Sequence, residues 1–344
     1  MKALVLKETK KIAIEEFRST ETLGPDDVRI GIRKVGICGS DVHYYVHGRI
    51  GDFVVNSPMV LGHEASGVVL EAGPHVTHLK VGDRVCMEPG IPEIGSPSTL
   101  AGTYNLDPKV RFWATPPVDG CMRESVVHPA AFTFKLPDNV SFEEGALVEP
   151  VAIGVYSSHT AGIEPGDVAL VFGAGTIGIV TALAALASGC AKVILTDIKD
   201  KKLDIVRKHF SANIVCVNSS KESLVDAVAS LGPEGVDIVF EASGNAAVIG
   251  SFIRYLRPNG RAVMIGMPTA PAAYDVVAAQ VKEIQIRHIF RYRNMYPRTI
   301  KMISSGTLNV KPLITHNFSF AKAVEAFDYA AAMPEEAIKI MVTL

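Results

Sequence analysis

The feature of this chain that most restricts its fold is an apolar run that ends in a glycine-rich turn. Val168–Phe172 is continuously apolar, and Gly173-Ala174-Gly175-Thr176-Ile177-Gly178 follows it directly. An apolar segment of helical length, Ile177–Ala187, continues from the turn. A strand, a GxGxxG turn and a helix in this order are typical of a dinucleotide-binding unit. The glycines allow a tight turn and let a pyrophosphate approach the helix N-terminus.

Short, largely apolar segments of strand length recur along the next hundred or so residues. The further runs are Lys192–Thr196, Asn213–Val217, Val236–Phe240 and Arg261–Ile265, and helix-length segments such as Lys199–Phe210 and Lys221–Leu231 lie between them. Continuous apolar strands that alternate with helices predict a parallel, doubly wound sheet, which is an α/β fold of the Rossmann type.

An acidic residue ends the strand that follows the turn. Asp197 lies about 20 residues beyond the glycine turn, the spacing at which such an acid binds the ribose 2′-hydroxyl. A 2′-phosphate would be repelled there, so the sequence favours NAD over NADP, although Lys199, Lys201 and Lys202 nearby weaken that preference slightly. The predicted cofactor-binding residues are Gly173, Gly175, Ile177, Gly178, Asp197 and Lys202.

Length and composition limit the class of protein. A chain of 344 residues is expected to form two domains. The net charge of −2 and the pI near 6.6 argue against nucleic acid or an anionic membrane as the main partner. The N-terminus lacks the pattern of a signal peptide, and Ile177–Ala191 is too short for a membrane span. Five scattered cysteines argue for a reducing cytoplasm.

Residues 1 to about 150 have a different pattern. Val28–Ile32 and Gly67–Glu71 alternate between apolar and other residues, and glycine–proline turns are frequent, so a β-rich barrel-like module is expected. The tail beyond residue 285 has helical patterns at Tyr296–Ser305 and Ser319–Ala332. Pattern alone does not decide whether this tail extends the second domain or returns to the first.

Two motifs in the β-rich part supply metal-ligand chemistry. One is Gly36-Ile37-Cys38-Gly39-Ser40-Asp41 and the other is Gly62-His63-Glu64, followed by Gly67 and Gly73. Cys38, His63 and Glu64 form an open set of three ligands that suits a catalytic zinc. Taken singly, each of them is also compatible with a structural role. A metal that polarises an alcohol, together with a cofactor that accepts hydride, indicates a dehydrogenase.

The run GHE-x2-G-x5-G-x2-V at Gly62–Val76 resembles the signature of the zinc-containing medium-chain alcohol and polyol dehydrogenases, and the resemblance extends over essentially the whole chain. The sorbitol and xylitol dehydrogenase branch is the most similar. The supporting segments are Glu88-Pro89-Gly90, Tyr104-Asn105-Leu106, Ala114–Pro117, Phe132–Pro137, Glu149-Pro150, Phe290-Arg291-Tyr292 and Val310–Leu313.

This resemblance implies a GroES-like catalytic domain built from residues 1–150 and completed by 286–344, with a Rossmann NAD-binding domain at 151–285. It implies that Ser40 and His43 relay the proton, and that Glu149 lies beside the metal as a catalytic residue and a possible ligand. The substrate-binding residues that we expect are Ser40, Tyr45, Phe112, Glu149, Arg291 and Tyr292. A homotetramer or homodimer is also implied.

The chain departs from many members of the family in one respect. It has no cysteine between Glu88 and Asp107, where those members carry four closely spaced cysteines for a second, structural zinc. A closed structural site requires four strong ligands, so we expect one catalytic zinc and no structural zinc. Packing is then expected to hold this segment.

The function that these observations predict is zinc- and NAD-dependent oxidation of a polyol to a ketose, of the xylitol or L-iditol 2-dehydrogenase type. Xylitol to xylulose and sorbitol to fructose are the leading reactions, and the segment Met87–Cys121 favours xylitol slightly. Another zinc-dependent secondary alcohol dehydrogenase is an alternative that Glu149 and the segment around Arg291 disfavour. A non-catalytic NAD-binding structural protein is a further alternative, and the intact metal-ligand set argues against it.

Overall fold

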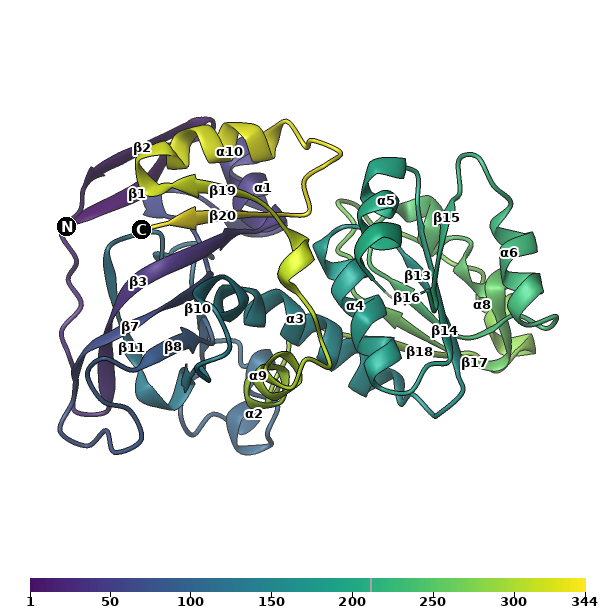
Figure 1. The fold of residues 1–344 in the computed structure, drawn as a ribbon, viewed down its shortest axis with the longest axis horizontal. Coiled ribbons are helices and arrows are strands. Elements are labelled where there is room, and N and C mark those ends of the chain that lie inside the picture. Colours follow the sequence, from purple (N-terminus) through teal and green to yellow (C-terminus); the bar gives the residue numbers. More distant parts are fainter. Residues whose placement is uncertain (211) are drawn as a thin grey trace. The chain divides into compact units, whose positions relative to one another are not determined.

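The structure is a computed structural model that describes residues 1–210 and 212–344. The chain divides into two compact units. The first contains Met1–Glu149 and Tyr296–Leu344, and the second contains Pro150–Met295. Figure 1 labels the helices and strands of both units. The sequence prediction placed the second boundary at residue 285, whereas the second unit runs to Met295 because a further strand, Gln285–His288, joins its sheet.

The first unit is built around a mainly antiparallel sheet with the strand order β12-β8-β7-β3-β20-β19, in which β11 also pairs with β3. The strands are β3 (Asp27–Ile37), β7 (Glu64–Ala72), β8 (Arg84–Met87), β11 (Ser125–Pro129), β12 (Thr133–Lys135), β19 (Ile314–Ser319) and β20 (Lys339–Thr343). Their buried faces are rich in Val and Ile, as in Val28, Ile30 and Ile32 of β3. This composition suits a pleated, packed surface.

Smaller elements complete the first unit. A second sheet joins β2 (Lys11–Glu16), β1 (Lys2–Glu8) and β6 (Met59–Val60). Two short hairpins pair β4 (Arg49–Ile50) with β5 (Phe53–Val54) and β9 (Gly90–Ile91) with β10 (Arg111–Phe112). The helices are α1 (Gly39–His47), α2 (Pro97–Leu100), α9 (Tyr296–Ser304) and α10 (Ala323–Ala331), and α3 (Phe142–Ala161) begins here and ends in the second unit.

The C-terminal tail returns to the first unit. Strand β20 pairs antiparallel with β3, so that Met341 lies opposite Gly36 and Ile340 opposite Ile37. Helix α10 packs against β19 and β20 and covers part of the sheet (Figure 1). This pairing answers the question that the sequence pattern left open for the tail.

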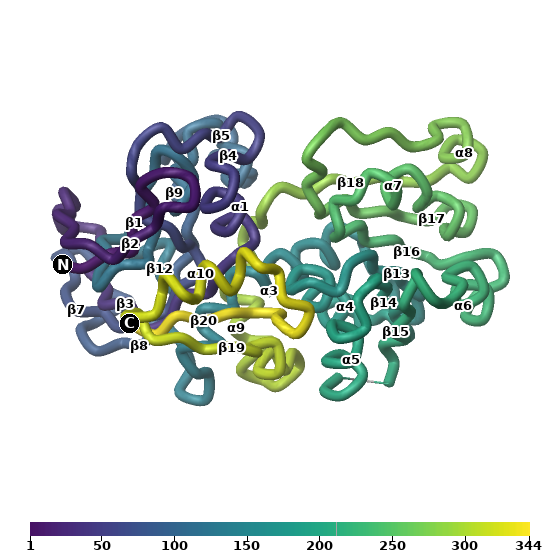
Figure 2. The backbone as a smooth tube through the Cα atoms, turned by 90° about the horizontal axis from the view of Figure 1, so that it is seen from above, coloured from purple at the N-terminus to yellow at the C-terminus, as the bar shows by residue number. Residues whose placement is uncertain are grey.

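The second unit is a parallel sheet with the strand order β15-β14-β13-β16-β17-β18, which Figure 2 shows in sequence across the unit. The strands are β13 (Val168–Phe172), β14 (Lys192–Asp197), β15 (Ile214–Asn218), β16 (Val236–Glu241), β17 (Leu256–Met264) and β18 (Gln285–His288). The helices are α4 (Thr176–Ala187), α5 (Asp200–His209), α6 (Leu224–Leu231), α7 (Ala246–Ile249) and α8 (Val276–Val281). The predicted α/β fold with a Rossmann-type sheet is confirmed.

Strand order in this sheet reverses at β13. The chain runs from β13 outward to β14 and β15, and then returns to β16 on the other side of β13. Open parallel sheets bind their ligands at such a switch point, outside the carboxyl ends of the strands. The glycine turn after β13 therefore lies at the position where a dinucleotide is expected.

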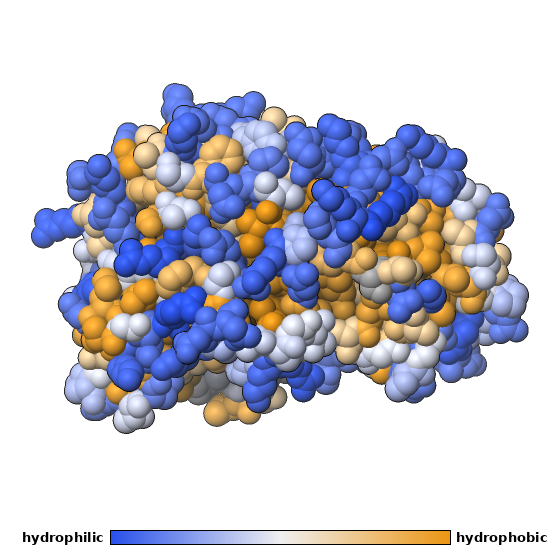
Figure 3. Space-filling view, viewed as in Figure 1, coloured by the Kyte–Doolittle hydropathy of each residue, from blue (hydrophilic) through white to orange (hydrophobic). Residues whose placement is uncertain are grey.

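The surface is mostly hydrophilic on the face that Figure 3 shows, with apolar side chains exposed in places. None of the helices that the structure describes is long and apolar enough to cross a membrane.

Candidate active site

Strand pairing brings the three predicted metal ligands together. Cys38 follows the end of β3 and forms the N-cap of α1, while Glu64 opens β7, in register with Gly36 of β3. Gly62 has φ +90°, a conformation that side chains rarely adopt, and it turns the chain so that His63 and Glu64 both reach the site. The ligand atoms of Cys38, His63 and Glu64 all lie within 4.8 Å of one another.

A buried aspartate orients this cluster. Oδ2 of Asp41 accepts a hydrogen bond from the backbone N–H of Cys38 at 3.0 Å, and its Oδ1 accepts one from that of Gly62 at 3.0 Å. The same Oδ1 lies 3.5 Å from Nδ1 of His63. Nε2 is therefore the ring nitrogen left for a metal, as in the carboxylate–histidine arrangement around many metal sites. Sequence reasoning missed Asp41, although an acid three residues after a helix N-cap was a usable signal.

The charges in the cluster stabilise one another. Burial tends to lower the pKa of His63, but the nearby Asp41 and Cys38 outweigh it and raise that pKa well above its ordinary value. Burial likewise tends to raise the pKa of Asp41, but His63 and the two backbone hydrogen bonds hold it below its ordinary value. A metal at this site therefore competes with a proton for His63.

Glu64 has a buried partner that the sequence did not reveal. Nζ of Lys339, on β20, donates to both carboxylate oxygens of Glu64 at 2.7 Å. Burial tends to lower the pKa of Lys339, but Glu64 and Cys38 raise it above its ordinary value. The donor set of thiolate, imidazole and carboxylate fits zinc, and the lysine helps to compensate the negative charge of these ligands.

Other predicted residues lie near the cluster in the first unit. The ring of Phe112 lies 5.6 Å from that of His63, so this side chain forms an apolar neighbour of the cluster. Ser40 and His43 lie on α1, which begins directly after Cys38. Nδ1 of His43 is buried and has no hydrogen-bond partner within the described residues. A buried, unpartnered imidazole nitrogen is suited to a ligand or a proton relay.

Glu149 is buried in α3 and interacts electrostatically with two other buried groups. It contributes to the raised pKa of Lys339 and of Glu88. Burial raises the pKa of Glu88 to about 7, the hydrogen bond from Tyr104 opposes this, and the charge of Glu149 adds to it. The structure therefore places the buried carboxyl of Glu88 within electrostatic reach of Glu149, a relationship that the sequence did not reveal.

Tyr45 is occupied elsewhere. Its hydroxyl donates to Oδ1 of Asp328 at 2.6 Å, and its ring packs edge-on against Phe327 of α10. Burial and the Asp328 carboxylate raise the pKa of Tyr45 to about 12. The structure therefore gives Tyr45 a role in packing α1 against α10, and its predicted contact with substrate stays a prediction without structural support.

The segment without cysteines is held by polar contacts as well as packing. Asp107 is buried and accepts hydrogen bonds from the backbone N–H groups of Glu93 at 2.6 Å and Lys109 at 3.0 Å. Hydrogen bonds, chiefly that from Lys109, keep the pKa of Asp107 below its ordinary value. One carboxylate thus links the backbone at Glu93 to the backbone at Lys109.

The glycine turn has the geometry of a dinucleotide site. Gly173 has φ +97°, and a side chain on Gly178 would collide with the carbonyl oxygen of Gly173. A side chain on Gly175, by contrast, would project into open space. This open face at the start of α4 is where a pyrophosphate would bind, so the turn fits a dinucleotide. Ile177 follows within the first turn of α4.

Asp197 ends β14 and also supports the turn. Its Oδ2 accepts a hydrogen bond from the backbone N–H of Ala174 at 2.7 Å, and its Oδ1 accepts one from that of Lys199 at 2.9 Å. Lys202 lies on α5 close after it. The carboxylate therefore fixes the backbone of the turn, and its predicted contact with a ribose stays a prediction.

Arg291 and Tyr292 lie in the second unit, directly after β18. Arg291 has φ +55°, and its guanidinium carbon lies 4.7 Å from the centre of the Phe290 ring. The side chain of Tyr292 is buried. The metal-ligand cluster belongs to the first unit, and the predicted approach of Arg291 and Tyr292 to it stays a prediction.

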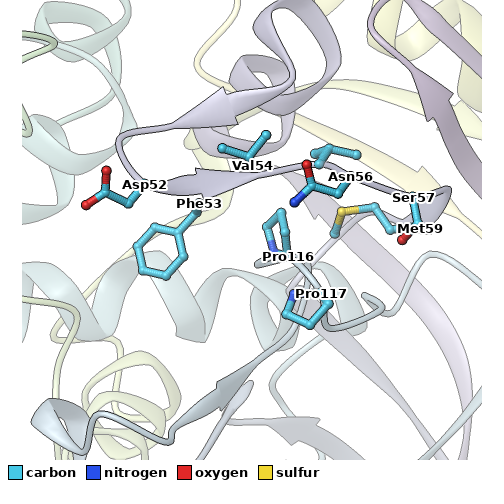
Figure 4. A pocket seen from close by; sticks show the side chains of 9 residues that line it. Asp52, Phe53, Val54, Asn56, Ser57, Met59, Pro116 and Pro117 are labelled. Atoms are coloured by element: carbon cyan, nitrogen blue, oxygen red, sulfur yellow. The ribbon is translucent and has the colours of Figure 1, made fainter.

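A pocket of about 250 Å³ opens elsewhere on the first unit, between the β4–β5 hairpin with its following loop and the Pro116-Pro117 turn (Figure 4). The lining residues are Asp52, Phe53, Val54, Val55, Asn56, Ser57, Met59, Pro116 and Pro117. None of the predicted ligand, catalytic or cofactor-binding residues lines it.

Comparison with known proteins agrees with this geometry. The family profile described as alcohol dehydrogenase GroES-like domain matches residues 24–138, and that described as zinc-binding dehydrogenase matches residues 176–305. The chain is 60% identical to a D-xylulose reductase of Morganella morganii over 96% of its length and 98% of the relative. It is 43% identical to a sorbitol dehydrogenase of Mus musculus over 95% of its length and 92% of the relative.

A solved structure shows the same architecture. It is an oxidoreductase/dehydrogenase of unknown specificity from Escherichia coli, with a TM-score of 0.94 and 33% identity, covering 99% of this chain and 98% of that one. The chain belongs to the zinc-containing medium-chain dehydrogenases, in the branch that contains D-xylulose reductases and sorbitol dehydrogenases.

Proposed function

We propose that this protein catalyses the zinc- and NAD-dependent oxidation of a polyol to a ketose, with xylitol to xylulose as the leading reaction and sorbitol to fructose as the second. The observation that carries the proposal is the convergence of Cys38, His63 and Glu64 with Asp41 behind the histidine. The preference for xylitol is supported by the relative named D-xylulose reductase, which is more similar than the one named sorbitol dehydrogenase.

Cys38, His63 and Glu64 hold the zinc, and Glu149 is a further candidate ligand or neighbour. When bound, zinc supplies a Lewis acid that lowers the pKa of an alcohol, and NAD supplies the hydride acceptor. Asp41 keeps the imidazole of His63 oriented, and Lys339 keeps the Glu64 carboxylate in place. We propose one catalytic zinc for the chain, because the segment Glu88–Asp107 has no cysteine to hold a second.

The proton of the substrate alcohol needs a path to water. Ser40 is proposed to accept it first, and His43, whose Nδ1 is buried without a partner among the described residues, to receive it next. Phe112 provides an apolar wall beside His63, which keeps water away from the reacting carbon.

The remaining contacts orient the two reactants. Arg291 and Tyr292 are proposed to bind substrate hydroxyls. Gly173, Gly175 and Gly178 receive the cofactor pyrophosphate at the start of α4, and Asp197 binds the ribose and disfavours a 2′-phosphate. We therefore propose NAD as the preferred cofactor.

Two further properties belong to this proposal. β18 ends the parallel sheet, with no further strand paired to its outer edge among the described residues, and Val276, Val277 and Val281 on α8 are exposed. Both features support a homo-oligomer, a dimer or a tetramer, that pairs through the second unit. The cysteines are free thiols, which supports a location in the reducing cytoplasm.

The test is the formation of reduced cofactor, NADH from NAD or NADPH from NADP, by the purified protein with xylitol, sorbitol, ribitol, galactitol, arabinitol and ethanol. The proposal predicts the highest kcat/KM with xylitol and NAD. Turnover of ethanol alone would instead identify a simple alcohol dehydrogenase. Bound NADH without turnover of any alcohol would indicate a non-catalytic NAD-binding protein.

A further inference from the structure

The segment that carries Arg291 has an unusual backbone. It leaves the carboxyl end of β18, where Ile289 still donates a backbone hydrogen bond to Met264 at 3.2 Å. Two of its non-glycine residues, Arg291 with φ +55° and Asn294 with φ +57°, then adopt the left-handed conformation. Residues other than glycine keep this conformation only where their surroundings hold it, and such residues gather at functional sites.

Part of what holds the segment is visible as burial. Tyr292 is 2% exposed and Met295 is 5% exposed, so the segment is anchored on either side of Asn294. The burial of these two side chains fixes the path of the chain on either side. It does not by itself fix Arg293, which lies between Tyr292 and Asn294.

Arg293 supplies that further anchor. Its guanidinium carbon lies 5.6 Å from the centre of the Tyr156 ring, and Tyr156 is a buried residue of α3. A guanidinium over a buried aromatic face is a stronger contact than the same pair in water, because the ring is shielded from solvent. The contact joins a residue two positions after Arg291 to a helix that is distant in sequence.

We propose that Arg293 and Tyr156 form a positioning pair that holds Arg291 in its left-handed conformation and so directs the Arg291 guanidinium toward the substrate hydroxyls. This inference rests on the proposed function, in which Arg291 binds the polyol. Arg293 and Tyr156 act through the backbone of the segment and touch neither reactant.

The test compares Arg293→Met with a matched control in the same unit. Arg254 lies over the half-buried Tyr255 ring at 5.9 Å, so Arg254→Met removes another arginine–tyrosine contact of the same unit, away from the segment. Arg293→Met is expected to speed amide hydrogen exchange in residues 290–294 and to raise the KM for the polyol about tenfold, the order of one shielded cation–π contact. NADH affinity and the exchange of other segments are expected to stay unchanged, as they do in Arg254→Met.

Two further variants sharpen the result. Arg293→Lys keeps a cation over the ring and is expected to retain most of the protection from exchange. In an Arg291→Met background, adding Arg293→Met is expected to raise the polyol KM no further, because the pair acts through Arg291.

Equal exchange in residues 290–294 of Arg293→Met and the unsubstituted protein would overturn the proposal, as would additive effects on KM in the double variant. If the unsubstituted protein oxidises no polyol, the proposed function fails. The exchange measurement then still decides whether Arg293 holds the segment, so the two failures are distinguishable.

Discussion

Nζ of Lys339 lies 2.7 Å from both carboxylate oxygens of Glu64, and the two side chains are 3% and 0% exposed. Glu64 is also one of the three residues proposed to hold zinc. The buried carboxylate of Glu64 therefore pairs with the Lys339 ammonium and, when zinc is present, also binds the metal ion. The lysine keeps Glu64 compensated whether or not a metal is bound.

Removal of this lysine should make folding depend on metal. In Lys339→Met the carboxylate of Glu64 stays buried without its partner, so the free energy of unfolding of the metal-free protein is expected to fall by about 3 kcal/mol. Zinc should recover part of this loss. Urea denaturation with and without zinc measures both values. Lys322→Met, which breaks an exposed pair with Glu325, is the control and should change stability by less than about 1 kcal/mol. An equal loss with and without zinc would contradict this account of Glu64.

The place of the Glu64 carboxylate depends on the absence of a side chain at Gly36. A methyl group there would overlap Oε2 of Glu64, so Gly36→Ala should displace the carboxylate and lower zinc affinity about 10- to 100-fold. Gly39→Ala is the matched control, because a methyl group at Gly39 meets nothing within 4 Å. Competition with a chromophoric chelator gives the affinities. Equal affinities in the two variants would show that Gly36 does not set the position of this ligand.

Alanine substitutions at two glycines of the nucleotide turn should have different effects on stability and on NADH binding. Gly178→Ala places a methyl group against the carbonyl of Gly173, so the protein is expected to lose about 1–3 kcal/mol of stability as well as NADH binding. Gly175→Ala meets no atom of the chain, so it should melt at the normal temperature but bind NADH at least about tenfold more weakly. Thermal melting and NADH fluorescence titration separate the two. Normal NADH affinity in Gly175→Ala would argue against a pyrophosphate at this turn.

A buried histidine should make the first unit sensitive to acid. Burial lowers the pKa of His128 to about 4, although its hydrogen bond to the carbonyl oxygen of Glu88 opposes this. A histidine whose pKa is lowered by folding stabilises the folded state above its unfolded pKa near 6.5, and this contribution is lost as the pH falls toward 4.

The stability of the unsubstituted protein relative to His128→Gln is therefore expected to decrease by about 2 kcal/mol between pH 7.5 and pH 5. Urea denaturation of both proteins at each pH gives this difference. The raised pKa of Glu88 acts in the opposite direction, but its effect is common to both proteins and cancels. A difference that does not change with pH would show that His128 titrates normally.

The parts of the site that sequence reasoning found are local. Cys38, His63 and Glu64 stand in short motifs, and the glycine turn combines with its flanking strand and helix within a few residues. Alternating strands and helices likewise predicted the parallel sheet, since both the periodicity and the burial of such strands are properties of short segments.

The missing parts depend on tertiary contacts. Lys339 is 275 positions from Glu64, and nothing in the composition of the C-terminal strand marks it as the partner of a buried acid. Tyr45 lies in a promising segment, but its hydroxyl bonds Asp328 on a helix near the other end of the chain. Asp107 accepts hydrogen bonds from the backbone N–H groups of Glu93 and Lys109, and only the fold shows which backbone groups it binds.

The central claim is that the cluster of Cys38, His63 and Glu64 makes this chain a zinc-dependent polyol dehydrogenase. The most direct test is the rate of NADH formation from xylitol and NAD, measured on the purified protein, after removal of metal by a chelator, and after zinc is added back. We expect the rate to be lost on chelation and restored by zinc, and to be absent in Cys38→Ser while NADH binding persists. Full turnover by the metal-free protein or by Cys38→Ser would contradict the claim.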